Sequence, residues 1–364
     1  MGARAGAGPD ARREVAAIAD PRPFVLKPDA TVGDVLEQVR ENGFGVVLGD
    51  DGEVLGTVDD GAVRRAALRH ASLDLPVMTV MSGRPLVADA GDGDQRAADL
   101  LRAYRVRAVP VVKSGRLVEV RTLDEVPNAG PGRAIAVVMV GGRGERLRPL
   151  TDKVPKPLLR IGPSSIVERL ITSLAAAGVE DVYLAVNYKA DEFDKKLGDG
   201  AQLGVRLHYM REREPLHTAG ALSMLPESPT GPVIVTNGDL VTDLDFARLL
   251  DYHWHHGGAI TVAGVEHRTQ IPYGVLRSVE HHLLEIDEKP ERRDFVSAGI
   301  YAMQPEVLRF IPPETRMGMP DLIADVLAEG LPVHVFPILE RWFDIGSPEE
   351  FETVLLQFAT GDQE

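Results

Sequence analysis

The chain has 364 residues, a formal net charge of −15 and no cysteine. Its length exceeds that of a usual single domain, so we expect two domains. The acidic balance, with no basic stripe to offset it, argues against a nucleic-acid partner. The lack of cysteine excludes disulfides and thiolate metal sites and fits a reducing, cytoplasmic compartment. No apolar run is long enough to span a membrane, so we expect no membrane partner.

The first third of the chain contains an internal repeat. Residues 44–58 and 108–120 each have the pattern of a strand, a glycine turn and a second strand. Each follows an amphipathic helical stretch, at 32–41 and at 95–104. This order predicts a pair of α+β modules within residues 1–126. Turn-forming residues then predict a linker at 127–133.

Part of the first repeat, GTVDDGAVRRAAL at 56–68, resembles a signature of CBS domains. In that family the pair often binds an adenine nucleotide, whose ribose is held by an aspartate at the position of Ala62. Because Ala62 has no carboxylate, and the second repeat lacks the usual Gly-x-Val-Thr, we expect scaffolding or dimerisation rather than ligand sensing. We therefore expect a homo-oligomer.

The second domain begins with a predicted buried parallel strand at 134–140, which leads into a loop rich in glycine and cations. The glycines lack a Cβ, so backbone N–H groups can approach a phosphate closely, and the cations match its charge. The spacing fits neither a P-loop nor a dinucleotide fingerprint, since Leu147 stands where the latter needs its third glycine. The candidate phosphate-binding residues are Gly141, Gly142, Arg143, Gly144, Arg146 and Lys156.

The runs GGRGERLRPLT at 141–151 and PKPLL at 155–159 resemble the signature of nucleotide-sugar pyrophosphorylases, the sugar-1-phosphate nucleotidyltransferases. The resemblance covers residues 134–356. It implies an α/β catalytic domain at 134–364 with a Rossmann-like, mixed but mainly parallel sheet of the GT-A kind. It also implies that the glycine loop wraps the triphosphate of a nucleotide, with Arg146 and Lys156 as catalytic cations.

After this loop, a helix at 165–177 and strands at 181–186, 205–210 and 232–236 predict a parallel sheet with ligands at its carboxyl ends. Asp239 follows the last of these strands, where a carboxylate can hold Mg²⁺ or form an Asx turn. The family pattern NGD makes Asp239 a metal ligand and catalytic residue by resemblance. WFDIGSP at 342–348 resembles the family's WxDIGTP and makes Asp344 the second metal ligand.

The segment 212–222 resembles the stretch that lines the family's base pocket, which implies nucleotide-binding roles for Glu212, Thr218 and Gly220. His217 stands where the family has glycine, and it either turns outward or narrows the pocket. Three histidines at 253, 255 and 256 suggest zinc, but we expect them to decorate a solvated helix because no other ligand type is nearby.

Three further segments, 272–275, 288–290 and 297–301, resemble the family's sugar-phosphate site, and we expect them at strand ends like the other motifs. The lysine of EKP would pair with the substrate's phosphate as a further catalytic cation, and serine replaces the family's asparagine at 297. The residues implied are Tyr273, Gly274, Glu288, Lys289 and Ser297.

Taken together, the resemblance implies transfer of a nucleoside monophosphate to a sugar-1-phosphate or a sugar-like cyclitol phosphate, with Mg²⁺ and without a protein nucleophile. GTP is the expected donor, because a carboxylate such as Glu212 can accept two hydrogen bonds from guanine and only one from uracil. The alternative is a regulatory or assembly protein built on a weakened transferase fold. Ala62, His217 and Ser297 favour that alternative, whereas the retained acids and cations oppose it.

Overall fold

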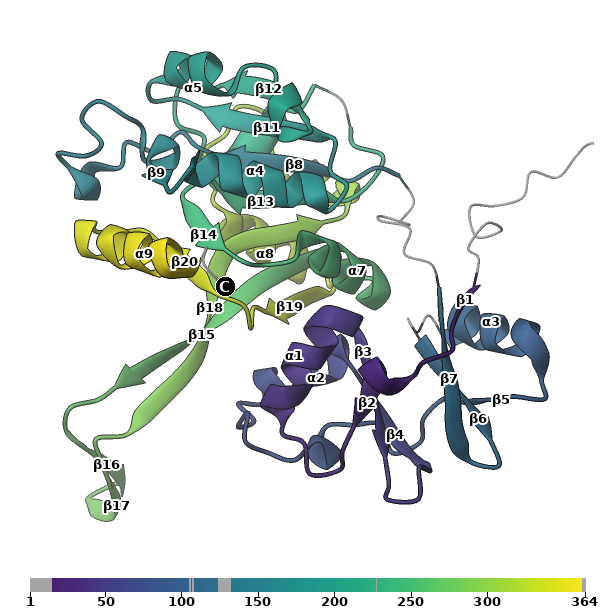
Figure 1. The fold of residues 1–364 in the computed structure, drawn as a ribbon. Coiled ribbons are helices and arrows are strands. Elements are labelled where there is room, and N and C mark those ends of the chain that lie inside the picture. Colours follow the sequence, from purple (N-terminus) through teal and green to yellow (C-terminus); the bar gives the residue numbers. More distant parts are fainter. Residues whose placement is uncertain (1–14, 105, 107, 124–131, 227, 362–364) are drawn as a thin grey trace, which may run out of the picture. The chain divides into compact units, whose positions relative to one another are not determined.

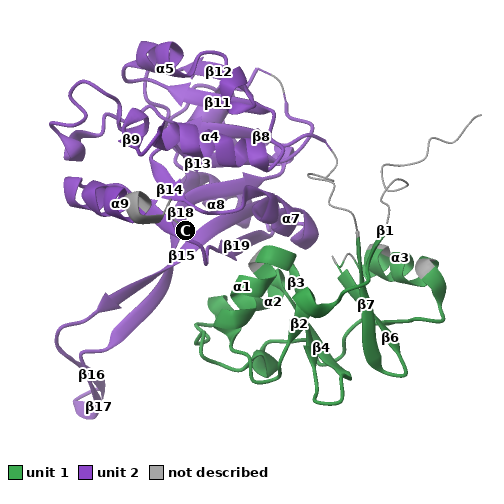
Figure 2. Ribbon diagram, in the orientation of Figure 1, with its two compact units in different colours: residues 1–126 green, residues 127–364 purple. Residues whose placement is uncertain are grey.

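The computed structural model describes residues 15–104, 106, 108–123, 132–226 and 228–361. The chain divides into two compact units, 1–126 and 127–364 (Figure 2). Most of the predicted linker at 127–133 lies outside the described residues.

Unit 1 repeats one order of elements, strand, helix, strand, strand, as the sequence predicts. The first copy consists of β2 (Val25–Leu26), α1 (Val32–Asn42), β3 (Phe44–Leu48) and β4 (Val54–Asp59), followed by α2 (Asp60–Leu68). The second consists of β5 (Ala88–Asp89), α3 (Gly93–Tyr104), β6 (Ala108–Lys113) and β7 (Arg116–Leu123). A further strand, β1 (Val15–Ile18), pairs with β7 and so joins the second sheet.

The two hairpins of unit 1 pack against each other. Val46 of the first and Val120 of the second belong to one buried cluster, and the amide of Leu117 donates to the carbonyl of Gly52. Apolar residues of both hairpins are therefore buried within the unit itself. The expected homo-oligomer stays a prediction.

Unit 2 is built on a seven-stranded sheet in the order β12-β11-β8-β13-β18-β15-β19 (Figure 1). The strands are β8 (Ile135–Met139), β11 (Asp181–Val186), β12 (Arg206–Arg211), β13 (Val233–Asn237), β15 (Ile260–Gln270), β18 (Glu291–Met303) and β19 (Val333–Pro337). The first four in that order run parallel, and β18 is antiparallel to both of its neighbours. The predicted mixed, mainly parallel sheet is confirmed.

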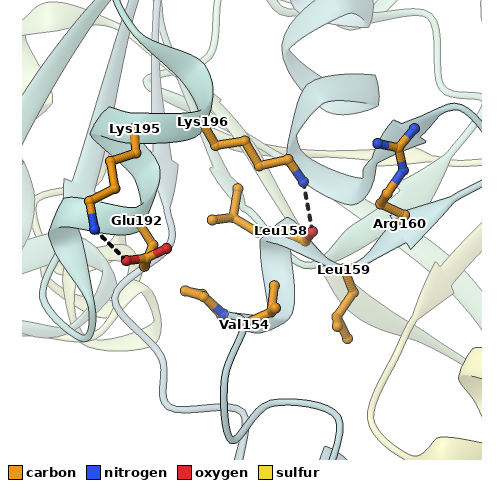
Figure 3. Close-up of a pocket in the computed structure, with 8 residues that line it drawn as sticks. Val154, Leu158, Leu159, Arg160, Glu192, Lys195 and Lys196 are labelled. Atoms are coloured by element: carbon orange, nitrogen blue, oxygen red, sulfur yellow. Dashed lines mark hydrogen bonds and ion pairs between the residues drawn. The ribbon is translucent and has the colours of Figure 1, made fainter.

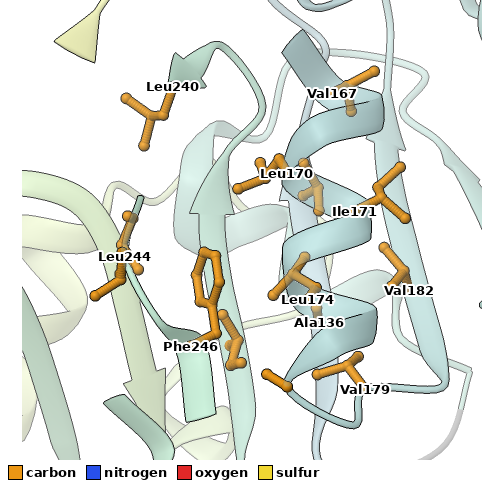
Figure 4. Packing of buried hydrophobic residues seen from close by; sticks show 14 of the residues in the cluster. Ala136, Val167, Leu170, Ile171, Leu174, Val179, Val182, Leu240, Leu244 and Phe246 are labelled. Atoms are coloured by element: carbon orange, nitrogen blue, oxygen red, sulfur yellow. The ribbon is translucent and has the colours of Figure 1, made fainter. Parts of the chain in front are cut away.

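Helices cover both faces of this sheet. The helices on the two faces are α4 (Ile166–Ala176), α5 (Ala190–Leu197) and α7 (Phe246–His256) on one, and α6 (His217–Gly220) and α8 (Met319–Ala328) on the other; α9 (Pro348–Gly361) packs in a separate cluster. Figure 4 shows Leu170, Ile171 and Leu174 of α4 beside Ala136 and Val182 of the sheet. Alternate residues of β8 enter separate clusters on the two faces, which explains its unbroken apolar sequence.

Two antiparallel strands extend beyond the sheet as an arm. The ladder of β15 and β18 continues to the pair Gln270 and Glu291, and the hairpin of β16 (Gly274–Val279) and β17 (His282–Glu288) forms its tip (Figure 1). The tip exposes several large apolar side chains, those of Leu276, Val279, Leu283, Leu284 and Ile286.

A small sheet near the end of the chain joins β14 (Leu240–Thr242) to β20 (Trp342–Asp344), and another joins β9 (Arg160–Ile161) to β10 (Ser164–Ser165). A buried cluster under the first of these sheets contains Leu147, Val241, Ile345 and Phe351. The glycine loop is therefore supported by the last elements of the chain. None of the described helices is both long enough and apolar enough to cross a membrane.

Candidate active site

The glycine loop follows β8 and ends in two short 3₁₀ turns, η4 (Glu145–Leu147) and η5 (Lys156–Leu158). Gly144 has a φ of +61°, and a Cβ there would lie 3.0 Å from the Cβ of Lys156. The hydroxyl of Thr151 donates to the carbonyl of Gly144 at 2.8 Å. Only glycine fits this left-handed, crowded position without strain, so the bend brings Lys156 under the loop.

Lys156 lies between the two acids that the sequence singles out. Its Nζ is 2.5 Å from Oδ2 of Asp239 and 3.6 Å from Oδ1 of Asp344, and its side chain is 8% exposed. The register of β14 and β20 places Asp344 opposite Leu240, next to Asp239. Two carboxylates and a buried cation thus meet where β8 and β13 end.

Lys156 and Asp239 border a pocket of about 410 Å³ that the glycine loop also lines. Its walls include Gly141, Gly142, Gly144, Arg146 and Lys156 from the loop, with Asn237, Asp239 and Gly346 from other segments. The side chain of Arg146 packs beside Gly346, and a Cβ at Gly346 would lie 3.2 Å from Nη1 of Arg146. The side chain of Arg143 is 72% exposed and lies 3.9 Å from Glu145.

The Asn-Gly-Asp turn is fixed by close packing against β8. The amide of Gly238 donates to the carbonyl of Met139 at 2.9 Å, and a Cβ at Gly238 would lie 2.4 Å from Cγ1 of Val140. Asn237, which the sequence reading did not select, packs its side-chain amide against Gly299. Its position at the end of an apolar strand was the signal that could have identified it.

Glu212 stands at the loop as well. Its Oε2 would lie 3.2 Å from a Cβ at Gly141, and its carbonyl accepts from Nδ2 of Asn187 at 3.2 Å. Burial raises the pKa of the Glu212 carboxyl, against a backbone hydrogen bond from Leu216 that lowers it. Asn187, at the end of β11, is a second strand-end residue that sequence reasoning missed.

Thr218 and Gly220, expected in the base pocket, contact the start of α8. The hydroxyl of Thr218 accepts from the amide of Met319 at 3.0 Å. A Cβ at Gly220 would lie 2.3 Å from the carbonyl oxygen of Thr315, and the Gly220 amide donates to Met317. In this structure both residues fix the chain that follows Glu212, and their nucleotide contacts stay predictions.

His217 adopts a left-handed φ of +64°, a conformation that costs a non-glycine residue about 1 kcal/mol or more. Its side chain is exposed and acts electrostatically on Glu212. Of the two alternatives the sequence left open, the structure has the side chain outward, in the neighbourhood of that carboxylate.

The five expected sugar-phosphate residues are not all brought to the pocket. Tyr273, Gly274, Glu288 and Lys289 lie together on the arm, where the amide of Lys289 donates to the carbonyl of Tyr273 at 3.3 Å. The expectation that these motifs lie at strand ends of the sheet is therefore wrong. They follow the ladder of β15 and β18 outward instead.

Ser297 is on the inner part of β18, and its hydroxyl shares a 2.9 Å hydrogen bond with that of Tyr301. Two residues along, Gly299 contacts Asn237, and the indole of Trp342 donates to the carbonyl of Ala298 at 3.1 Å. Ser297 therefore lies on the same stretch of β18 as Ala298 and Gly299, which contact the segments that carry the two acids.

The family model for nucleotidyl transferases matches residues 135–360, and that for the CBS domain matches residues 15–69. The first match covers more than half of the chain. The chain belongs to the nucleotidyl transferase family. Its resemblance to this family and to CBS domains, read from the motifs, is confirmed.

Relatives of this nucleotidyl transferase include the mannose-1-phosphate guanyltransferase of Aspergillus fumigatus, 36% identical over 229 residues, or 60% of this chain and 62% of that protein. The mannose-1-phosphate guanylyltransferase of Mycobacterium tuberculosis is 33% identical over 223 residues, or 59% of this chain and 62% of that protein. The chain thus spans about 62% of the length of these relatives.

A crystal structure of a Bacillus anthracis protein assigned as a glucose-1-phosphate thymidylyltransferase has the same fold. It superposes with a TM-score of 0.51 at 19% identity and covers 62% of this chain and 96% of its own. The α/β fold of this nucleotidyl transferase is thereby confirmed.

Of the three histidines of α7, His255 is exposed as expected, but for His253 the expectation of a solvated position is wrong. His253 is fully buried, with Nδ1 2.8 Å from the hydroxyl of Thr261 and Nε2 3.1 Å from the amide of Gln304. Burial lowers the pKa of His253 to about 4. Among the residues that the structure describes, no group of three or more possible ligands could hold a metal by itself.

Proposed function

We propose that the chain transfers GMP from GTP to a sugar-1-phosphate or a sugar-like cyclitol phosphate and releases pyrophosphate. A phosphate oxygen of the acceptor forms a bond to the α-phosphorus, and the bond between the α-phosphorus and the bridging oxygen to the β-phosphate breaks. The observation that carries this proposal is the convergence of Lys156, Asp239 and Asp344 at the end of the glycine loop. The guanylyltransferase names of the relatives support the choice of GTP.

The two carboxylates fit a Mg²⁺ ion. Mg²⁺ prefers oxygen ligands and is usually held by one or two carboxylates together with substrate phosphates and water. Asp239 and Asp344 offer such a pair: Asp239 lines the pocket, Ile345 and Gly346 next to Asp344 line it as well, and the two acid side chains are 31% and 49% exposed. When bound, the ion would neutralise charge on the α-phosphate and on the leaving pyrophosphate.

The chain's own residues would then bind and orient the triphosphate. The backbone from Gly141 to Gly144 is open to phosphate oxygens, and Arg146 lies at the wall of the same pocket. Lys156 is held between the two acids, so a phosphate that approaches would meet a cation already in position. Positioning and charge neutralisation would be the whole of catalysis, since no protein nucleophile is required.

Guanine selection would depend on Glu212. The carboxylate lies against Gly141 at the start of the glycine loop, and it follows β12, which lies on the other side of β8 from β13, the strand before Asp239. It can accept hydrogen bonds from N1–H and the exocyclic amine of guanine. Because this carboxylate is partly buried, a base that leaves it without a hydrogen-bond donor would bind less tightly, which favours discrimination between bases.

The test is release of pyrophosphate over a grid of GTP, ATP, CTP, UTP and dTTP with mannose-1-phosphate, glucose-1-phosphate and cyclitol phosphates. We expect release with GTP and at least one acceptor, and none from a Lys156→Met variant. A folded chain that releases no pyrophosphate with any pair would support the alternative, a regulatory or assembly protein built on the same fold.

A further inference from the structure

A second pocket, of about 500 Å³, borders the segment that carries Lys156 (Figure 3). Pro155 and Leu158 line this pocket, whereas Lys156 and Pro157, between them, line the candidate active site. The two pockets therefore share one 3₁₀ turn, η5, as a wall. We call the second one the α5 pocket, because α5 contributes Glu192, Lys195 and Lys196 to its lining, beside Val154, Leu159 and Arg160.

The α5 pocket is rich in cations. Arg160, Lys195 and Lys196 line it, and Glu192 is the one acid among its lining residues. Glu192 is already paired with Lys195 at 2.9 Å. Nζ of Lys196 donates to the carbonyl of Leu158 at 3.0 Å, which leaves two of its three N–H groups for a ligand.

Glu168 also acts electrostatically on Arg160 and Lys196. Its Oε2, however, accepts from both the amide and the hydroxyl of Ser165 at 2.6 Å, in the capping box of α4. One carboxylate held in this way faces two cations. The rim therefore keeps a surplus of positive charge.

The floor between these cations is apolar. In Figure 3, Leu158 lies below Lys196 and Val154 lies below Leu158, and Val154 is 38% exposed. The volume falls within the range of small-molecule sites. Cations at the rim and aliphatic groups on the floor match a phosphate attached to a ring.

We propose that the α5 pocket binds a phosphomonoester of a small ring-bearing metabolite, a sugar phosphate or a nucleoside monophosphate. Arg160 and Lys196 contact the phosphate, and the ring packs on Val154. None of the residues assigned to the transfer reaction is needed for this binding, so the site is separate from the proposed active site.

The hydrogen bond from Lys196 to Leu158 couples the two pockets. A phosphate that engages Lys196 changes the restraint on η5, and η5 carries Lys156 one residue after Pro155. The ligand therefore alters the affinity for GTP, and GTP alters the affinity for the ligand by the same factor. This coupling, unlike the binding itself, rests on the proposed function.

Binding is tested by calorimetry on the full chain with three probes: inorganic phosphate, glucose 6-phosphate and AMP. Arg160→Gln removes a charged hydrogen-bond donor from the rim, and we expect a loss of affinity of about tenfold or more. Val154→Asn removes the apolar floor, so it should weaken the ring-bearing probe and leave inorganic phosphate unchanged. Whichever of glucose 6-phosphate and AMP binds more tightly identifies the source of the ring.

Two matched arginine variants locate the ligand. Arg143→Gln removes an exposed cation from the glycine loop, and Arg309→Gln removes one from η8 (Pro305–Phe310), outside both pockets. Of the three arginine variants, the proposal requires that only Arg160→Gln weakens binding of the probe. A loss confined to Arg143→Gln would place the ligand in the active site, and absence of binding at millimolar concentration, or equal binding by wild type and Arg160→Gln, would overturn the α5 pocket. These experiments measure binding and not turnover, so their result can be interpreted even if the proposed transfer reaction is not found.

Discussion

Replacing Asp239 by asparagine separates the charge of this carboxylate from its shape. Asparagine keeps the side-chain size and one oxygen, so it can still accept a hydrogen bond from Lys156. It cannot supply the negative charge that the proposed Mg²⁺ site needs. We expect turnover to fall by about 10³ or more, because charge developing on the transferred phosphate is no longer neutralised in position.

The effect on folding is smaller. Two unit charges 2.5 Å apart attract by roughly 7 kcal/mol at an effective dielectric of about 20, before hydration is counted. Hydration of Asp239, which is 31% exposed, offsets most of this attraction, and Asp344 at 3.6 Å from Nζ leaves Lys156 with a counter-ion in the variant. The net loss should be that of one charged hydrogen bond, about 2 kcal/mol. For a unit of this size that lowers Tm by about 4–8 °C.

Asp243→Asn is the matched control. Asp243 lies four residues away, is 28% exposed, and pairs with Arg341 at 2.5 Å outside the pocket lining. It should lower Tm by a similar or smaller amount and leave turnover unchanged. Turnover and Tm are compared at saturating GTP, acceptor and Mg²⁺. If Asp239→Asn retained turnover within tenfold of wild type, or if Asp243→Asn lost as much, the carboxylate would have no special role.

Glu212→Gln should lower the preference for GTP over ATP in kcat/KM by roughly tenfold to a hundredfold, and an unchanged preference would remove Glu212 from base selection. His217→Gly relieves a left-handed φ of +64° and should raise the free energy of unfolding by about 1 kcal/mol in urea titrations; a loss of stability would contradict the strain. Gly144→Ala should lower stability by about 1–2 kcal/mol and should also lower turnover, since the added Cβ would crowd the Cβ of Lys156. His253 is neutral when folded, with a pKa of about 4 against 6.5 unfolded, so its contribution is complete above pH 6.5 and is lost as pH falls toward 4. Between pH 7 and pH 5 the wild type should lose about 2 kcal/mol more than a His253→Gln variant, and equal pH profiles would contradict a buried neutral imidazole.

The strands of the central sheet were predictable from the sequence. The strand at 181–186 was predicted with its observed bounds, and the strands near 135, 206 and 233 were predicted to within one residue at each end. The physical reason is burial on both faces of a parallel sheet. It forces continuous runs of β-branched and aliphatic residues, which differ clearly from helical periodicity.

His253 shows a local signal that was available and was given too little weight. Phe246, Leu249, Leu250 and His253 follow the spacing i, i+3, i+4 and i+7 and form the buried face of α7. The histidine cluster drew attention to composition. The helical period predicts that His253 lies in the core and His255 on the exposed face, and the structure has them there.

The position of the arm could not be read from the sequence. The motifs at 272–275 and 288–290 identify residue types, but the direction in which β15 and β18 leave the sheet depends on the register and the bulge near Gly264. The tip also breaks the alternation that predicts a half-buried strand, because Leu283 and Leu284 are adjacent and both exposed. Exposure of this kind follows from tertiary structure alone.

The pairing of β14 with β20 has a consequence for synthesis of the protein. During synthesis, the glycine loop and Asp239 are complete about a hundred residues before Asp344 is added, because β8 and β13 precede β20 in the chain. The buried cluster around Leu147 of the loop is likewise incomplete until Ile345 and Phe351 have been added. The nascent protein therefore carries the glycine loop without Asp344 and without its supporting cluster, and the candidate site is complete only when α9 has been synthesised.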